Sequence, residues 1–138
     1  MKKIIALCCV VGLFSSSVAL ASDATDALFK KYKAEGVTKV DAEKGKKDWT
    51  KKEWNSKSKA APAEVLSCSS CHKTDLTAVG EHHKTHKEIK PMSTKVNAER
   101  FTDEKKIEKW FKRNCMDTRG QECTAQEKAD FLAFFLAQ

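Results

Sequence analysis

The sequence predicts an all-α fold in a single domain that spans residues 22–138. Two observations indicate it. Four segments carry apolar residues at helical spacing, and three of them begin at a residue that caps helices well. No segment shows the alternation of polar and apolar residues that is typical of a strand, so we expect no β-structure.

The segments predicted as helices are residues 22–34, 41–54, a stretch that begins near Phe101, and a terminal stretch after Thr124. Ser22 or Asp23 can cap the first, and Asp41 can cap the second. Thr124 and Glu127 form a capping box, in which each side chain binds the backbone N–H of the other residue. Residues 55–63 are polar and lysine-rich, which predicts a loop.

The first 21 residues are typical of a secretory signal peptide. Lys2 and Lys3 precede the apolar run Ile4–Leu13, and the small residues Ala19-Leu20-Ala21 form a cleavage site. We therefore expect cleavage after Ala21 and export to the periplasm. The apolar run is too short for a stable membrane anchor, and no other run approaches the length needed, so we expect no anchor.

The net charge is +7, from 26 basic and 19 acidic residues. A basic balance is compatible with nucleic acid, but an exported protein rarely meets any, so we expect no nucleic-acid partner. Attraction to an acidic protein partner fits the charge better.

Of the six cysteines, Cys8 and Cys9 lie in the signal peptide. The other four are Cys68, Cys71, Cys115 and Cys123.

The motif C-S-S-C-H places Cys68 and Cys71 one helical turn apart, with His72 directly after them. A zinc site would combine the two thiols with His82 and His86, but it leaves His72 without a role. A thioredoxin-like dithiol would need a preceding strand, and none is predicted. Covalent haem uses all three residues: two thiols form thioethers with the haem vinyl groups, and the histidine binds the iron. The sequence therefore predicts one haem c.

Residues 73–98 have no helical period, and we expect them to form a long loop that wraps the cofactor. The ligand on the other face of the iron stays open at this point. The candidates are two methionines, three histidines and one asparagine: Met92, Met116, His82, His83, His86 and Asn114. A thioether ligand is typical of an electron carrier with a high potential. Asn114 lies at helical spacing with Trp110, although an asparagine there is also a common helix C-cap.

Gly45 and Trp49 lie one turn apart in the second predicted helix. This pair resembles the helix crossing of class I c-type cytochromes, where a glycine of an N-terminal helix packs against a C-terminal helix. The resemblance implies that fold, with Phe131, Phe134 or Phe135 as the partner of Trp49 and with a loop around a covalent haem.

Residues 100–138 resemble the sphaeroides haem protein (SHP) family of class I cytochromes c. The shared elements are R-F-T-D at 100–103, E-K-W at 108–110, R-N-C at 113–115, E-C-T at 122–124 and E-K-A-D at 127–130. D-A-E-K-G-K-K-D-W at 41–49 and the haem stretch at 68–92, with its K-E-I-x-P segment, also fit the family.

The resemblance implies that the asparagine of R-N-C, Asn114, is the distal iron ligand and that Cys115 and Cys123 form a disulfide. It also implies that Asn114 leaves on reduction, so that the ferrous haem binds O2, NO or CO. The activity associated with the family is electron exchange with a dihaem cytochrome c, and the resemblance implies the same activity here. An amide oxygen is a hard donor that suits Fe(III) better than Fe(II), which agrees with this picture.

The chain departs from the family at Met92 and at the histidine cluster of His82, His83 and His86. Two other functions are therefore kept open. One is an ordinary electron shuttle with His72 and either Met92 or Met116 as ligands. The other is a small haem enzyme acting on oxygen, nitric oxide or peroxide, with one of the three histidines as its acid–base group.

Five lysines flank the haem stretch and could guide an acidic redox partner: Lys73, Lys84, Lys87, Lys90 and Lys95.

Overall fold

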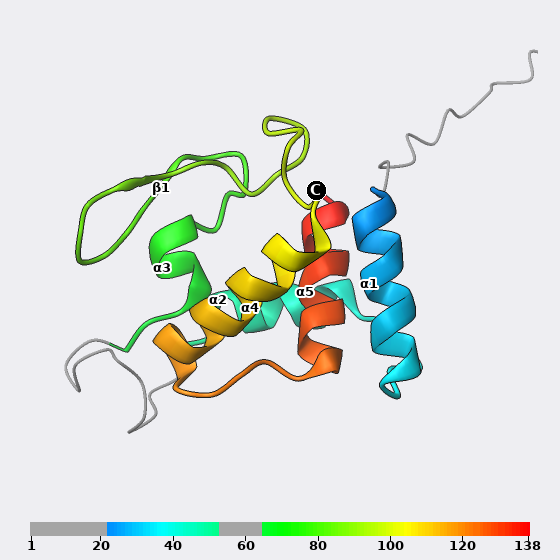
Figure 1. Cartoon of the computed structure of the whole chain (residues 1–138). Helices are drawn as coiled ribbons and strands as arrows, with labels where there is room; N and C mark the ends of the chain where they lie inside the picture. Colours follow the sequence, from blue (N-terminus) through cyan, green and yellow to red (C-terminus); the bar gives the residue numbers. More distant parts are fainter. Residues whose placement is uncertain (1–21, 53–64) are drawn as a thin grey trace, which may run out of the picture.

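The computed structural model describes residues 22–52 and 65–138, which form five helices and one two-stranded hairpin (Figure 1). The signal peptide predicted for residues 1–21 and the loop predicted for residues 55–63 lie outside the described residues. Within the described ranges, no helix combines the length and the apolar content that crossing a membrane requires.

The first two helices begin where the sequence places their caps. Helix α1 (Asp23–Ala34) follows Ser22, whose Oγ accepts a hydrogen bond from the Thr25 N–H. Helix α2 (Ala42–Thr50) follows Asp41, whose Oδ1 accepts from the Lys44 N–H at 2.9 Å. The prediction that this helix reaches Trp54 is wrong, because α2 ends at Thr50 and residue 51 is extended. Its buried residues lie before that point, and residues 50–52 are exposed, so no packing favours continuing the helix.

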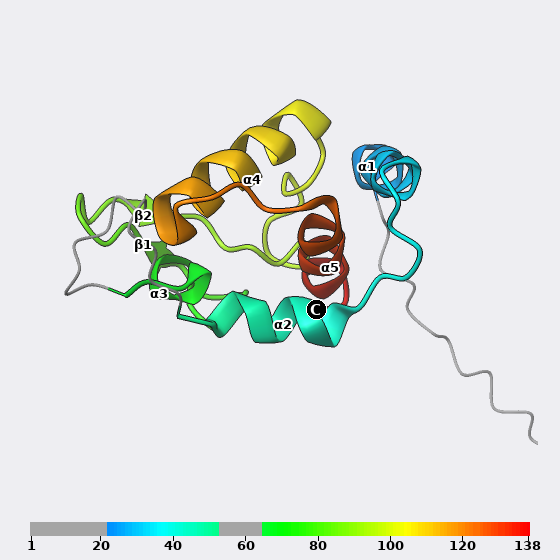
Figure 2. The same ribbon diagram turned by 90° about the horizontal axis from the view of Figure 1, so that it is seen from below.

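Helix α2 crosses the C-terminal helix α5 (Ala125–Leu136), as Figures 1 and 2 show. The contact is so close that a Cβ on Gly45 would lie 2.1 Å from the backbone oxygen of Asp130. The Trp49 ring packs against three rings of α5 at centroid distances of 5.1 to 6.3 Å: Phe131, Phe134 and Phe135. The predicted crossing of N- and C-terminal helices is therefore confirmed.

Helix α4 (Glu104–Arg119) begins after Asp103, whose Oδ1 accepts from the Lys106 N–H at 3.0 Å. It ends at Gly120, which adopts the left-handed conformation with φ 70° and donates its N–H to the Met116 oxygen. Asn114 thus lies well inside the helix. The alternative interpretation of Asn114 as a C-cap is wrong, because glycine adopts the left-handed conformation at less cost and ends the helix instead.

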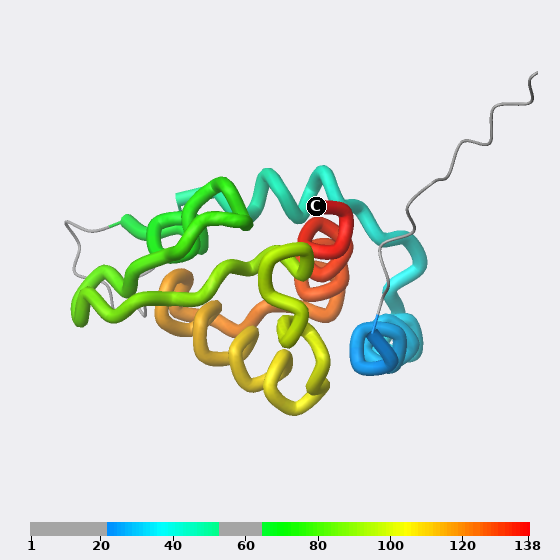
Figure 3. The backbone as a smooth tube through the Cα atoms, turned by 90° about the horizontal axis from the view of Figure 1, so that it is seen from above, coloured from blue at the N-terminus to red at the C-terminus, as the bar shows by residue number. Residues whose placement is uncertain are grey.

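The segment between the short helix α3 (Cys68–His72) and α4 contains a small antiparallel hairpin of β1 (Gly80–Glu81) and β2 (Glu88–Ile89). The expectation of no β-structure is therefore wrong in this detail, although the domain is otherwise helical. Strands of two residues are too short to produce a visible alternation in the sequence. The segment then crosses from α3 towards α5 before it turns back into α4 (Figure 3).

Candidate haem site

Helix α3 presents the C-S-S-C-H motif, and three contacts hold it in place. The Ser67 N–H donates to Ser70 Oγ at 3.0 Å, which caps the helix start. Trp49 of α2 donates its indole N–H to the Lys73 carbonyl at 2.9 Å, just past the helix end. A Cβ on Gly80 would lie 2.3 Å from the Cys71 carbonyl oxygen, so β1 lies directly against α3. The motif is thus fixed to both the crossing helices and the hairpin.

Cys68 and Cys71 both line one large cavity, and neither forms a disulfide. Burial raises the pKa of the Cys68 thiol to about 11, so this sulfur is protonated at neutral pH. The Cys71 sulfur lies 3.6 Å from His83 Nδ1. Two thiols one helical turn apart at the edge of a cavity fit the thioether chemistry that the motif predicts.

His72 lines the same cavity, with its ring 5.4 Å from the Trp49 ring. Burial lowers the pKa of His72 to about 4, and the nearby positive charge of Arg100 adds to the effect. The imidazole is therefore neutral at neutral pH, which is the form that binds metal. Its buried Nδ1 makes no hydrogen bond to any described residue.

The cavity has a volume of about 690 Å³, in the range of sites that bind a large organic cofactor. Its walls come from α2, α3, α4, α5 and the segment between α3 and α4. The aromatic and aliphatic side chains that line it are Trp49, Leu66, Ile89, Met92, Phe101, Ile107, Trp110, Phe111, Phe131 and Phe135. A flat apolar macrocycle with thiol-reactive vinyl groups fits this lining, the two thiols and the neutral imidazole together.

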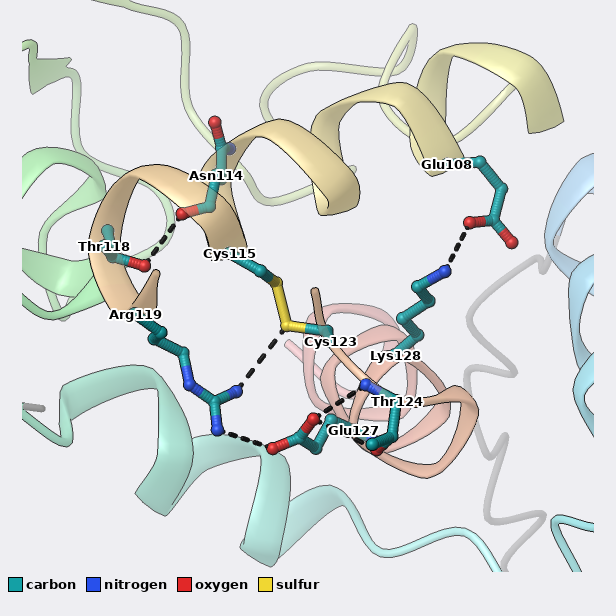
Figure 4. The surroundings of a disulfide bond; sticks show 9 residues. All are labelled: Glu108, Asn114, Cys115, Thr118, Arg119, Cys123, Thr124, Glu127 and Lys128. Carbon is teal, nitrogen blue, oxygen red and sulfur yellow. Dashed lines mark hydrogen bonds and ion pairs between the residues drawn. A yellow bond between two sulfur atoms is a disulfide. The ribbon is translucent and has the colours of Figure 1, made fainter. Parts of the chain in front are cut away.

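Asn114 lies on the wall that α4 contributes. Its backbone oxygen accepts a hydrogen bond from Thr118 Oγ1 at 2.8 Å. The next residue, Cys115, forms a disulfide with Cys123, with a Cα–Cα distance of 5.7 Å. Figure 4 shows the Asn114 side chain directed away from this disulfide. Helix α4 thus directs the Asn114 side chain away from the disulfide that joins the helix to Cys123.

The other ligand candidates separate into two groups. Met92, His82 and His83 line the cavity, and Met92 is buried. Met116 does not line it, because two residues of helix turn it away from the face of Asn114. His86 is also absent from the lining, and its Nδ1 lies 2.7 Å from Glu81 on an exposed surface.

Sequence reasoning missed several cavity residues with ionisable side chains, which are Glu88, Glu99, Arg100, Asp103, Lys106 and Asp117. In the sequence, Arg100 stands out only as part of the R-F-T-D element. Its position before a helix and beside Phe101 gives only a weak indication that it belongs to the site. The cavity is formed by segments that are distant in the sequence, and local spacing does not show which of their residues meet.

Comparison with known proteins identifies relatives of the whole domain. The family profile described as "Domain of unknown function (DUF1924)" matches residues 35–135. The cytochrome c-type protein SHP of Cereibacter sphaeroides is 38% identical over 121 residues, covering 87% of this chain and 89% of that protein. Cytochrome c'' of Methylophilus methylotrophus is 39% identical over 85 residues, covering 62% of this chain and 59% of that protein.

Two solved structures share the fold. Oxidised SHP, described as an oxygen-binding cytochrome c, matches with a TM-score of 0.73 and 35% identity, over 85% of this chain and 98% of that structure. Oxidised cytochrome c'' of Methylophilus methylotrophus matches with a TM-score of 0.68 and 31% identity, over 83% and 94%. Both relatives are c-type haem proteins with covalently bound haem. The chain therefore belongs to the SHP family, within the DUF1924 domain family, and is a monohaem c-type cytochrome.

Proposed function

We propose that this cytochrome holds its haem iron between His72 and a labile Asn114, binds diatomic ligands when reduced, and exchanges electrons with another cytochrome. In this proposal Cys68 and Cys71 form the two thioethers. The observation that carries it is the position of Asn114, whose helix forms a wall of the cavity that also contains His72.

The donor chemistry explains why such a ligand would be released. The amide oxygen of Asn114 is a hard, neutral donor, which suits Fe(III) better than the softer Fe(II). With such a donor, reduction would weaken the bond and would leave one coordination position for O2, NO or CO. The apolar side chains of Trp110 and Phe111 line the same cavity and would favour small uncharged ligands there.

The names of two relatives support this proposal. SHP is described as an oxygen-binding cytochrome c. The solution structure of cytochrome c'' is described as giving insight into haem-ligand detachment, and it matches this chain with a TM-score of 0.66 and 33% identity.

Absorption spectroscopy tests the proposal. We expect the oxidised protein to lack a near-infrared charge-transfer band of a methionine–iron bond, and the reduced protein to take up carbon monoxide at once. In Asn114→Ala the ferric spectrum should change, because the ligand is lost, while carbon monoxide uptake persists. A ferric spectrum that is the same in Asn114→Ala and the parent would contradict the assignment of Asn114.

A second candidate is a shuttle ligated by His72 and Met92, because Met92 is buried and lines the cavity. Methionine favours Fe(II) and would keep the site closed on reduction. The variant Met92→Leu separates the two. A shuttle would lose the methionine band and gain carbon monoxide binding, whereas a haem ligated by Asn114 would change neither property.

The location and partner are part of the same proposal. We place the protein in the periplasm, exported by the signal peptide of residues 1–21. Its redox partner in this proposal is an acidic dihaem cytochrome c, guided by the lysines around the haem stretch. Three of them line the cavity itself: Lys84, Lys87 and Lys90.

A further inference from the structure

Arg100 is a half-buried cation on the wall of the haem cavity. Two of its N–H groups bind backbone carbonyls of the preceding segment. Nε donates to the Pro91 oxygen at 2.8 Å, and one Nη donates to the Lys90 oxygen. Asn97 Nδ2 also donates to the Pro91 oxygen, at 3.1 Å, which fixes that acceptor. The guanidinium is therefore held in one orientation, with three of its five N–H groups still available.

No anion in the described part of the chain balances this charge. Residues 22–52 and 65–138 contain no ion pair that involves Arg100, and both of its acceptors are neutral carbonyls. Burial lowers the pKa of the guanidinium, with no anionic partner opposing that effect. A partly buried charge is costly unless an opposite charge and hydrogen bonds compensate it. An anion bound next to Arg100 would therefore be stabilised at this point of the cavity.

The position of Arg100 indicates which anion it is. Helix α3 lies near the C-terminal end of α4, since Cys68 and Thr118 line one small pocket. Arg100 precedes Asp103, the cap at the opposite end of this 16-residue helix, and Figure 2 shows the two ends of α4 far apart. Haem carries its vinyl groups on one edge and its two propionates on the opposite edge. A haem joined to α3 through its vinyl edge would therefore have its propionates on the side of the cavity where Arg100 lies.

We infer that Arg100 binds a haem propionate and thereby raises the reduction potential of the iron. Guanidinium and carboxylate match in geometry, and such pairs form short, charge-assisted hydrogen bonds. The positive charge favours the reduced haem, which carries one positive charge fewer than the oxidised haem. The inference rests on haem attachment at α3 and not on Asn114 as a ligand.

The test compares Arg100→Gln, Arg100→Lys and the control Lys105→Gln in the haem-loaded protein. Lys105 is exposed in the first turn of α4 and does not line the cavity, so its variant removes one nearby charge without changing the cavity wall. Potentiometric titration at constant pH and salt gives the reduction potential. Redox-difference infrared spectra give the carboxylate bands of the propionates.

We expect Arg100→Gln to lower the potential and to shift the propionate bands. Arg100→Lys should keep most of the potential, because the charge remains, yet shift the bands, because the forked geometry is lost. Lys105→Gln should change neither. The inference is overturned if Arg100→Gln matches the parent in both measurements. It is also overturned if the two Arg100 variants lower the potential equally with unchanged bands, since that result assigns Arg100 to the support of residues 90 and 91 alone.

If Arg100→Gln does not fold, the infrared spectrum of Arg100→Lys decides, with shifted bands supporting the inference and unchanged bands overturning it. The ferric absorption spectrum of Asn114→Ala, compared with that of the parent, reports separately on Asn114. The two proposals can therefore fail independently of each other.

Discussion

At the scale of single residues, Gly45 has the most demanding position in the fold. It lies in the middle of α2, where alanine would ordinarily be more favourable by about 1 kcal/mol. Instead, the backbone of α5 occupies the place of its side chain. The close approach of the two helices is what allows Trp49 to reach the three phenylalanines of α5.

Gly45→Ala should destabilise the protein although it improves helix propensity. The added methyl would overlap the Asp130 carbonyl, which is rigid backbone, so the helices must separate at a cost of about 1–3 kcal/mol. Urea unfolding followed by circular dichroism measures the change. Lys46→Ala, on the exposed side of the same helix, is the control and should be close to neutral. Equal stability of Gly45→Ala and the parent would show that the crossing is looser than the structure indicates.

At the scale of elements, Glu108 of α4 joins three helices. Its two carboxylate oxygens each lie 2.7 Å from a lysine ammonium, Lys31 of α1 and Lys128 of α5. Leu28 and Tyr32 of α1 are also buried against the core. Helix α1 lies outside the matched family range of residues 35–135, and this contact is one of those that bind it to the domain.

Glu108→Gln should remove part of the acid sensitivity of folding. Burial opposes ionisation of Glu108, but hydrogen bonds from Lys128 and Lys31 outweigh it and hold the pKa below its ordinary value of 4.5. A carboxylate with a lowered pKa in the folded state stabilises the protein above pH 4.5, and the stabilisation is lost as the pH falls through the folded pKa. We expect a loss on the order of 1 kcal/mol at pH 7 in the variant.

Urea unfolding at pH 7 and between pH 5 and pH 3 gives the comparison. The difference between Glu108→Gln and the parent should shrink as the solution becomes more acidic. Glu43→Gln, an exposed acid in the first turn of α2, is the matched control. A difference that stays constant over the whole pH range would mean that the ionised form of Glu108 does not stabilise the fold.

The disulfide joins the end of α4 to the start of α5. Both cysteines are buried, and eight positions separate them in the chain. Arg119 adds a second connection over the same turn, with its Nη2 2.6 Å from Glu127 Oε1 (Figure 4). The turn between the helices is thus fixed on both sides of Gly120.

Replacing both Cys115 and Cys123 by serine should lower the free energy of unfolding by about 2–3 kcal/mol, from loop-closure entropy. Thermal unfolding with and without a thiol reductant measures it. The reductant should shift the parent towards the variant and leave the variant unchanged. If thiol titration proves that the bridge is reduced while the parent keeps its midpoint, the bridge contributes nothing to stability.

At the scale of the whole molecule, the domain is organised around its cavity. Without haem, the apolar side chains that line this cavity of about 690 Å³ would be in contact with water, which is unfavourable. A domain of this size is stable by only about 5–15 kcal/mol. The haem is therefore part of the core, and its ring replaces the contacts that the surrounding side chains would otherwise lack.

Cys68→Ala combined with Cys71→Ala should give a chain without covalent haem that lacks the cooperative thermal transition of the parent. Circular dichroism would follow unfolding, and haem staining on denaturing gels would confirm loss of attachment. Ser69→Ala, between the two thiols, is the control and should retain its haem. A cooperative transition of the haem-free chain at the temperature of the parent would refute this dependence.

Much of this structure follows from local sequence. The caps Ser22, Asp41 and Thr124 and the C-S-S-C-H motif depend on neighbours in the chain, so spacing and residue type are sufficient to predict them. The crossing at Gly45 was predicted from the resemblance to class I cytochromes, because the helix that Gly45 meets is distant in the sequence. The hairpin and the end of α2 escaped prediction because packing and pairing across the fold decide them.

The same division applies to the haem site. Spacing alone left Met92, Met116, the three histidines and Asn114 as open candidates, and only the resemblance to the SHP family favoured Asn114. The tertiary structure narrowed the set, because Asn114, Met92, His82 and His83 line the cavity and Met116 and His86 do not. It also placed Arg100, which precedes α4 in the chain, in the cavity wall. Local interactions thus specify the helices and the haem-binding motif, whereas the residues that meet across the haem depend on how distant segments pack.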